Sequence, residues 1–163
     1  MKKTMSIIAL FIVLLISVSA NTSVTTKAVV DPKLPKLELI GRDSLTVELD
    51  SLLGSYTVIH FWSAEDAPSR IKAIELDRCV ASAEGRLNLL SINTDDNIRL
   101  FREIVRMDGL DEATQFYAGS ATASASLRGC GLGRGLSTIL LAPDGTIVEV
   151  NPTVENLSQA FGL

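Results

Sequence analysis

The stretch YTVIHFWSAEDAPSRIKAIELDRCV (residues 56–80) decides the fold, because its periodicity changes from strand to helix within a few residues. Its first part, YTVIHFW, is a continuous β-branched and aromatic run, which is typical of a central strand covered on both faces. Pro68 then stands where the first turn of a helix tolerates proline. After it, apolar residues follow at helical spacing: Ile71, Ile74, Leu76 and Val80. The stretch predicts a buried strand followed by an amphipathic helix.

The flanking sequence extends this pattern in both directions. RLNLLSIN (86–93) predicts a second buried strand, and TDDNIRLFREIVRMDG (94–109) predicts a second helix, with Thr94 or Asp95 as its cap and Gly109 at its end. Upstream, LELI (37–40) and LTVEL (45–49) predict a short hairpin at the sheet edge.

The last third of the chain begins with a long connection. Residues 110–136 lack a sustained period, and so long a segment is usually functional or contains short helical turns of its own. STILLAPDGTIVEV (137–150) then predicts two strands around a Pro-Asp-Gly turn, and TVENLSQAFGL (153–163) predicts a helix capped by Thr153. We expect an α/β sandwich with a central mixed sheet and helices on both faces.

Residues 1–20 have the pattern of a secretory signal peptide. Lys2 and Lys3 precede an apolar run that is shorter than the roughly 20 residues needed to span a bilayer, and Val18-Ser19-Ala20 resembles a cleavage site. We expect cleavage after Ala20, a flexible segment over 21–36, one domain over 37–163, and an extracytoplasmic protein, periplasmic or secreted, without stable membrane insertion.

The charge of the chain excludes one class of partner. Cleavage removes two of the 15 basic residues and none of the 19 acidic ones, so the net charge changes from −4 to −6. Binding to phosphate backbones requires a basic surface, and we therefore expect no nucleic-acid partner.

The order of elements and the residues around the first helix resemble the thioredoxin-like superfamily, in particular its extracytoplasmic bacterial thiol-disulfide oxidoreductase and AhpC/TSA-like branch. Phe61-Trp62, Pro68 and Arg70 match the sequence around the family's Cys-x-Pro-Cys motif. Asp66 and Ser69 stand at the two cysteine positions, and Ser137 stands where the resemblance implies a cis-proline. The resemblance implies a three-layer thioredoxin-like fold.

The missing sulfur atoms exclude ordinary dithiol chemistry at this position. Thiol-disulfide exchange requires an attacking thiolate and a second thiol, and neither a carboxylate nor a hydroxyl replaces them. Cys79 lies roughly 15 Å along the predicted helix from Ser69. Cys130, in the glycine-rich segment, is the alternative reactive thiol, and it would make the protein a thiol-disulfide oxidoreductase or peroxiredoxin-like antioxidant. Whether Cys79 and Cys130 are unpaired or form a disulfide stays open at this point.

Two interpretations compete for the polar residues near the motif. Asp66 and Ser69 suit the first turn of a helix as capping and hydrogen-bonding residues. His60, the only histidine, is expected to point toward Ser69, either as a buried hydrogen-bonded side chain or as the base of a hydrolase whose nucleophile is Ser69. The resemblance also implies a peptide-binding groove, in which Trp62 would line the surface or instead pack in the core. Its candidate residues are Trp62, Asp66, Ala67, Pro68, Leu136 and Ser137.

No motif predicts a metal or a cofactor. One histidine, scattered carboxylates and two distant cysteines lack metal-ligand spacing, and GCGLGRG (129–135) precedes a strand instead of opening a helix, unlike a dinucleotide-binding loop. We expect a thioredoxin-like protein without its redox dithiol, which acts as a non-catalytic binding or accessory module for an extended peptide or an envelope protein.

Overall fold

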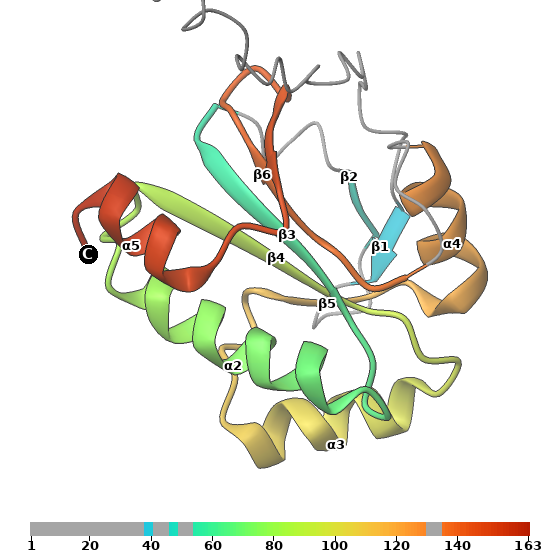
Figure 1. The fold of residues 1–163 in the computed structure, drawn as a ribbon. Helices are drawn as coiled ribbons and strands as arrows, with labels where there is room; N and C mark the ends of the chain where they lie inside the picture. The colour runs from blue at the N-terminus through green and yellow to red at the C-terminus, as the bar shows by residue number, and fades with distance from the viewer. Residues whose placement is uncertain (1–37, 41–45, 49–53, 130–134) are drawn as a thin grey trace, which may run out of the picture.

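The computed structural model describes residues 38–40, 46–48, 54–129 and 135–163. Within them the chain forms a mixed sheet of seven strands with the order β2-β1-β5-β4-β3-β6-β7 (Figure 1). The elements, in chain order, are β1 (Glu38–Ile40), β2 (Thr46–Glu48), β3 (Tyr56–Trp62), α2 (Ala67–Ala81), β4 (Leu87–Asn93), α3 (Ile98–Asp108), β5 (Gln115–Tyr117), α4 (Gly119–Gly129), β6 (Thr138–Leu141), β7 (Ile147–Val150) and α5 (Val154–Phe161).

The two long central strands are the continuous apolar runs of the sequence. β3 and β4 pair in parallel, with β5 parallel to β4 and β6 antiparallel to β3. All of β3 after Tyr56 is buried, as expected for a strand covered on both faces. The predicted edge hairpin is confirmed, because β1 and β2 pair antiparallel at the end of the sheet.

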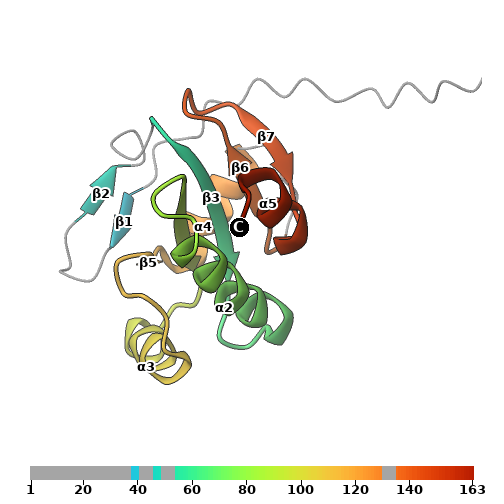
Figure 2. The same ribbon diagram turned by 90° about the vertical axis from the view of Figure 1, so that its left-hand side faces the viewer.

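Helices cover both faces of the sheet, and this confirms the expected three-layer α/β sandwich (Figures 1 and 2). On one face, α4 packs through Ala123 and Leu127 against side chains from the central strands. On the other face, α2 packs with α5 in one cluster and with α3 in another. The first half of α2 therefore packs with α3 through Ala73, and its second half packs with α5 through Leu76 and Cys79.

The helix ends follow local capping rules, with one correction to the sequence prediction. Asn97 caps α3 by accepting hydrogen bonds from the amides of Arg99 and Leu100, so the prediction of Thr94 or Asp95 as the cap was wrong. The helix begins later because Asp95 is used elsewhere, in bonds to Ser63 and Ala64. Gly109 ends α3 as predicted, and it does so in the left-handed conformation; Thr153 caps α5 as predicted.

The segment 110–136 is more regular than the sequence suggested. It contains strand β5 and the eleven-residue helix α4, and residues 130–134 lie outside the described residues. α4 buries Ala123, Ser126 and Leu127, which are spaced as one helical stripe. Small residues give a weak hydrophobic signal, and a three-residue strand gives almost none, so periodicity alone could not find either element.

A row of buried polar side chains crosses the sheet beneath α2 and α3. Thr138 of β6 lies opposite His60 of β3, His60 is in register with Ser91 of β4, and Ser91 is in register with Gln115 of β5. All four are buried. Side chains in register on neighbouring strands share a face, so these four residues form a continuous polar row, which we call the polar row.

The proposed signal peptide, residues 1–20, and the lead-in, residues 21–36, lie outside the described residues. In the part of the chain that the structure describes, none of the helices is both long and apolar enough to cross a membrane.

Candidate functional site

Asp66 begins helix α2 as its N-cap. Its Oδ2 accepts a hydrogen bond from the amide of Ser69 at 2.8 Å, while Ala67 and Pro68 occupy the first helical positions. This bond from the Ser69 amide is the main cause that lowers the pKa of Asp66. The capping interpretation of Asp66 is confirmed, and its carboxylate is an acceptor for the helix terminus.

Ser69 is buried in the first turn of α2 and has two partners. Its hydroxyl donates to the carbonyl oxygen of Asp66 at 3.0 Å and accepts from the amide of Ser63 at 3.3 Å. The hydroxyl proton is therefore held by a backbone carbonyl. This confirms the prediction that Ser69 is a hydrogen-bonding residue of the first turn.

His60 lies under the start of α2 with both ring nitrogens bonded. Nε2 is 2.8 Å from the carbonyl oxygen of Ser69, and Nδ1 is 2.9 Å from the hydroxyl oxygen of Thr138. A carbonyl only accepts, so Nε2 bears the proton and, in the neutral ring, Nδ1 accepts from Thr138. Burial is the largest cause that lowers the pKa of His60 to about 4, so the ring is neutral at pH 7. The prediction of a buried hydrogen-bonded histidine is confirmed.

This geometry contradicts the hydrolase hypothesis for His60 and Ser69. A general base must reach the proton of the nucleophile, but His60 contacts the backbone carbonyl of Ser69, and the Ser69 hydroxyl donates to Asp66. The strand places the imidazole beneath the helix turn, where the nearest acceptor is main chain. His60 and Ser69 are thus linked, but through a structural contact.

Trp62 does not line a groove, which corrects one of the groove candidates. Its side chain is 0% exposed and packs with Ala73 of α2 and Phe101 of α3, whose ring centroid lies 6.1 Å away. As the last residue of β3, Trp62 projects to the same face as His60, and α3 covers it there. The alternative interpretation, packing in the core, is confirmed.

The Leu136-Ser137 segment enters the sheet beside β3. No peptide bond between described residues is cis, so the bond before Ser137 is trans. The amide of Phe61 donates to the carbonyl of Ser137 at 3.0 Å, and this fixes the segment against the strand. Neither backbone group of Leu136 hydrogen-bonds to another residue that the structure describes. Within the described part of the chain, the amide and carbonyl of Leu136 thus have no main-chain partner at the end of β3.

A small hollow of about 160 Å³ lies beside Leu136. It is bounded by Thr94, by Gly135 and by the face of α4 that includes Ser124 and Leu127. Among the described residues, this hollow does not extend to Ala67 or Pro68, which are exposed on the other side of the β3 end. The predicted groove is thus divided into a hollow at Leu136 and an exposed surface at the start of α2.

Arg70, the basic residue that follows the motif, has a structural partner. Its Nε and Nη2 contact the two carboxylate oxygens of Asp108 at 2.6 Å each, a bidentate pair that joins α2 to the end of α3. A planar guanidinium suits this fork-like pairing. Arg70 therefore holds the first turn of α2 to the end of α3.

The structure describes one of the two cysteines, Cys79. Cys79 is a free, buried thiol whose Sγ lies 3.7 Å from the hydroxyl of Ser158 on α5. The unpaired interpretation is therefore confirmed for Cys79, and the disulfide alternative is wrong. Cys130, the alternative reactive thiol, lies outside the described residues.

The acidic turn after β4 joins loops together. Asp95 accepts from the Ser63 hydroxyl at 2.6 Å and from the Ala64 amide at 2.8 Å, while Asp96 accepts from the amide and hydroxyl of Ser120, both at 2.9 Å.

Over the described ranges, no three histidine, cysteine, aspartate or glutamate side chains are grouped to hold a metal ion.

Sequence reasoning missed the β4–β5 half of the polar row. Ser91 interrupts an otherwise apolar strand, and that interruption was the available signal. Gln115 fell in the segment interpreted as a connection. Their side-chain oxygens, Oγ of Ser91 and Oε1 of Gln115, are buried and have no hydrogen-bond partner among the described residues.

Comparison with known proteins supplies relatives among solved structures. No protein-family model and no curated protein matches this sequence. A thioredoxin-like protein from Parabacteroides distasonis is 32% identical, with 68% of this chain and 82% of that chain covered and a TM-score of 0.62.

Two further structures are similar in fold. A thiol:disulfide interchange protein from Bacteroides sp. has a TM-score of 0.69 at 18% identity, covering 77% of this chain and 83% of its own. The exposed lipoprotein thioredoxin of Streptococcus pneumoniae has a TM-score of 0.61 at 16% identity, covering 78% of this chain and 98% of its own.

Proposed function

The chain belongs to the thioredoxin-like family, and on that premise we propose that it is a binding module without redox activity that holds an extended peptide beside Leu136. The observation that supports this most is the hydrogen bonding at the start of α2. By the sequence resemblance, Asp66 and Ser69 stand at the positions of the redox cysteines, and their side chains are bonded to the helix terminus and to neighbouring backbone groups. Oxygen atoms in these roles cannot form or exchange a disulfide.

Peptide binding is supported by main-chain groups at the end of β3. Leu136 has an amide and a carbonyl without partners among the described residues, and such groups pair with an extended peptide as an added strand does. The adjacent hollow is large enough for one apolar side chain of that peptide. Backbone pairing would supply affinity, and the hollow would supply selectivity.

A peptide selected from a phage-displayed random library on the purified protein provides the test. Ser124→Tyr fills the hollow from the exposed side of α4 and should weaken binding by at least about tenfold, the worth of one buried apolar side chain. Ala125→Tyr is the matched control, because Ala125 is exposed on the same helix and does not line the hollow. Equal affinities in the two variants would contradict the proposed site.

A second pair of variants asks whether the peptide also covers the start of α2. Ala67 is exposed at the first position of that helix, and Ala81 is exposed at its last. If the peptide extends from Leu136 across the β3 end, Ala67→Trp weakens binding and Ala81→Trp does not. If both leave the affinity unchanged, the peptide is confined to the hollow.

We also propose that the protein acts outside the cytoplasm. The apolar run and the Val18-Ser19-Ala20 site support this proposal, as does the similarity to an exposed lipoprotein thioredoxin. N-terminal sequencing of the protein recovered from the cell envelope or medium should begin at Asn21. A start at Met1 would contradict cleavage.

A further inference from the structure

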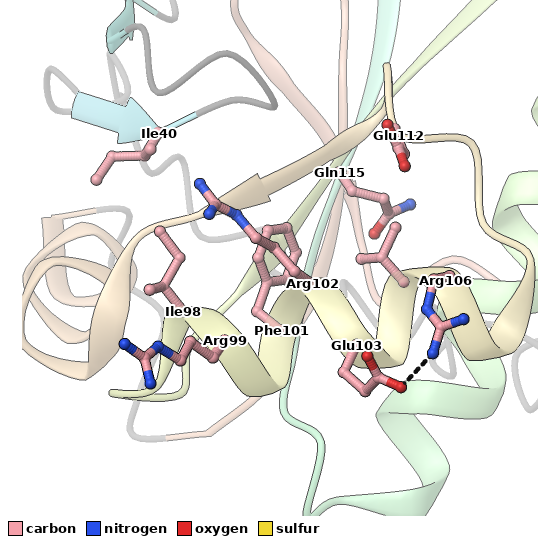
Figure 3. Close-up of a pocket in the computed structure, with 10 residues that line it drawn as sticks. Ile40, Ile98, Arg99, Phe101, Arg102, Glu103, Arg106, Glu112 and Gln115 are labelled. Carbon is pink, nitrogen blue, oxygen red and sulfur yellow. Dashed lines mark hydrogen bonds and ion pairs between the residues drawn. The ribbon is translucent and has the colours of Figure 1, made fainter.

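A second, larger hollow lies on the opposite face of the sheet from Leu136. It has a volume of about 450 Å³, within the range typical of sites for small organic ligands, and it lies between α3, β5 and β1 (Figure 3). Its apolar wall is formed by Ile40, Ile98, Phe101 and Val105. We call it the α3 pocket.

An unpartnered acceptor lines this pocket. Gln115 is 2% exposed, and its Nε2 donates to the hydroxyl of Thr114 at 3.0 Å. Its Oε1 is buried and accepts no hydrogen bond from any described residue. Buried acceptors are nearly always satisfied, because an unpaired one loses its bonds to water without replacement. Oε1 of Gln115 therefore favours a ligand that brings a hydrogen-bond donor.

The rim of the α3 pocket is positively charged. Arg99, Arg102 and Arg106 line it together with Glu103 and Glu112, which leaves a net charge of +1 on the lining side chains of a chain whose overall charge is −4. Glu103 is paired with Arg106. The balance of charge favours a single negative charge on the ligand.

Arg102 is the guanidinium best placed to meet that charge. In Figure 3 it reaches from α3 toward Ile40, on the same side of the helix as Gln115. Arg102 already makes an interaction, but a guanidinium has five N–H donors and can bind a carboxylate in addition.

We propose that the α3 pocket binds a small organic monocarboxylate that combines an aromatic or branched hydrocarbon body with an N–H donor, as in an N-acylated hydrophobic amino acid. The carboxylate contacts Arg102, the hydrocarbon body lies on Phe101 and Val105, and the N–H group donates to Oε1 of Gln115. This proposal is independent of the peptide site, because the two hollows lie on opposite faces of the sheet.

Three related compounds test the proposal on the unaltered protein. N-acetyl-L-phenylalanine has all three features, its C-terminal amide lacks the charge, and 3-phenylpropionate lacks the N–H donor. Titration into ¹⁵N-labelled protein should give saturable shifts in α3, β5 and β1, with N-acetyl-L-phenylalanine bound about tenfold more tightly than either relative. Equal affinity for all three compounds, or no saturable shift at millimolar concentration, would overturn the proposal.

Two substitutions then assign the contacts. Arg102→Gln should weaken the binding of both carboxylates about tenfold and leave the affinity for the amide unchanged. Arg78 is an exposed arginine of α2, and Arg78→Gln, which makes the same change in charge, should alter the affinity for none of the three compounds. Gln115→Leu should reduce N-acetyl-L-phenylalanine to the affinity of 3-phenylpropionate. Thermal unfolding verifies that each variant is folded. If folded Gln115→Leu still bound N-acetyl-L-phenylalanine more tightly than 3-phenylpropionate, the assigned donor contact would be contradicted.

Discussion

The two halves of the polar row differ in how completely they are bonded. In the β6–β3 half, His60 contacts Thr138 and the carbonyl of Ser69, and both ring nitrogens of His60 have a partner. In the β4–β5 half, Oγ of Ser91 and Oε1 of Gln115 have none among the described residues. The bonded half lies beneath the start of α2, whereas in the other half Gln115 lines the α3 pocket. Within the polar row, the residue that lines the α3 pocket is thus one of the two whose side-chain oxygen is unpaired.

The largest effect should come from breaking the bonded half. His60→Leu leaves the carbonyl of Ser69 and the hydroxyl of Thr138 buried without their partner, so the free energy of unfolding should fall by about 4 kcal/mol. Urea denaturation measures the change. A loss below about 1 kcal/mol would show that the row tolerates an apolar residue and that its bonded half is not structural.

The next effect is a dependence of stability on pH. His60 has a pKa of about 4 when folded and 6.5 when unfolded, so between these values the unfolded chain binds more protons. Stability from neutral His60 is complete above pH 6.5 and is lost as pH falls toward 4, by up to about 3 kcal/mol.

A comparison of the wild type with His60→Gln isolates the contribution of His60 to the pH dependence of stability. The variant lacks the titrating ring, so its stability should change much less between pH 6.5 and 4.5. Carboxylates whose pKa is lowered, such as Asp66 and Asp96, act mainly below this window. Parallel stability curves for the two proteins would rule out the assigned role of His60.

A smaller effect is expected at the helix cap above the row. Asp66→Ala removes the acceptor for the Ser69 amide and should cost about 1 kcal/mol, whereas Asp66→Asn, which keeps an acceptor, should cost less. Chemical denaturation of both variants provides the comparison. If the alanine variant were as stable as wild type, Asp66 would need a role other than capping.

The smallest effect should come from the unbonded half. Ser91→Ala removes a hydroxyl that has no partner among the described residues, so stability should change by less than about 1 kcal/mol, in the stabilising direction if the hydroxyl is unpaired. A loss of more than about 2 kcal/mol would show that Ser91 is bonded and would remove the contrast between the two halves.

Much of the fold was predictable because its signals are local. Some features depend on only a few neighbouring residues, and the structure confirms them: the apolar runs of β3 and β4, the caps Asp66 and Thr153, and the helix end at Gly109. β5 and α4 were not found, because a three-residue strand and a helix of small residues have little periodicity.

The candidate site was predictable only in part. Burial of His60 and capping by Asp66 follow from their positions in the strand and the helix. His60 contacts the carbonyl of Ser69 and not its hydroxyl because of how the imidazole ring is placed beneath the helix turn. The polar row depends on the register between strands that are far apart in the sequence. These are non-local properties, and the burial of Trp62 under Phe101 of α3 is another.

The most direct test of the account is an insulin-reduction assay with dithiothreitol. It compares the wild type with Asp66→Cys/Ser69→Cys, a variant that places two cysteines at the start of α2, where the sequence resemblance puts those of the family. We expect the wild type to leave the uncatalysed rate unchanged and the double variant to contain a titratable dithiol that accelerates reduction. Turnover by the wild type that is lost in Cys130→Ser would contradict the proposed absence of redox activity.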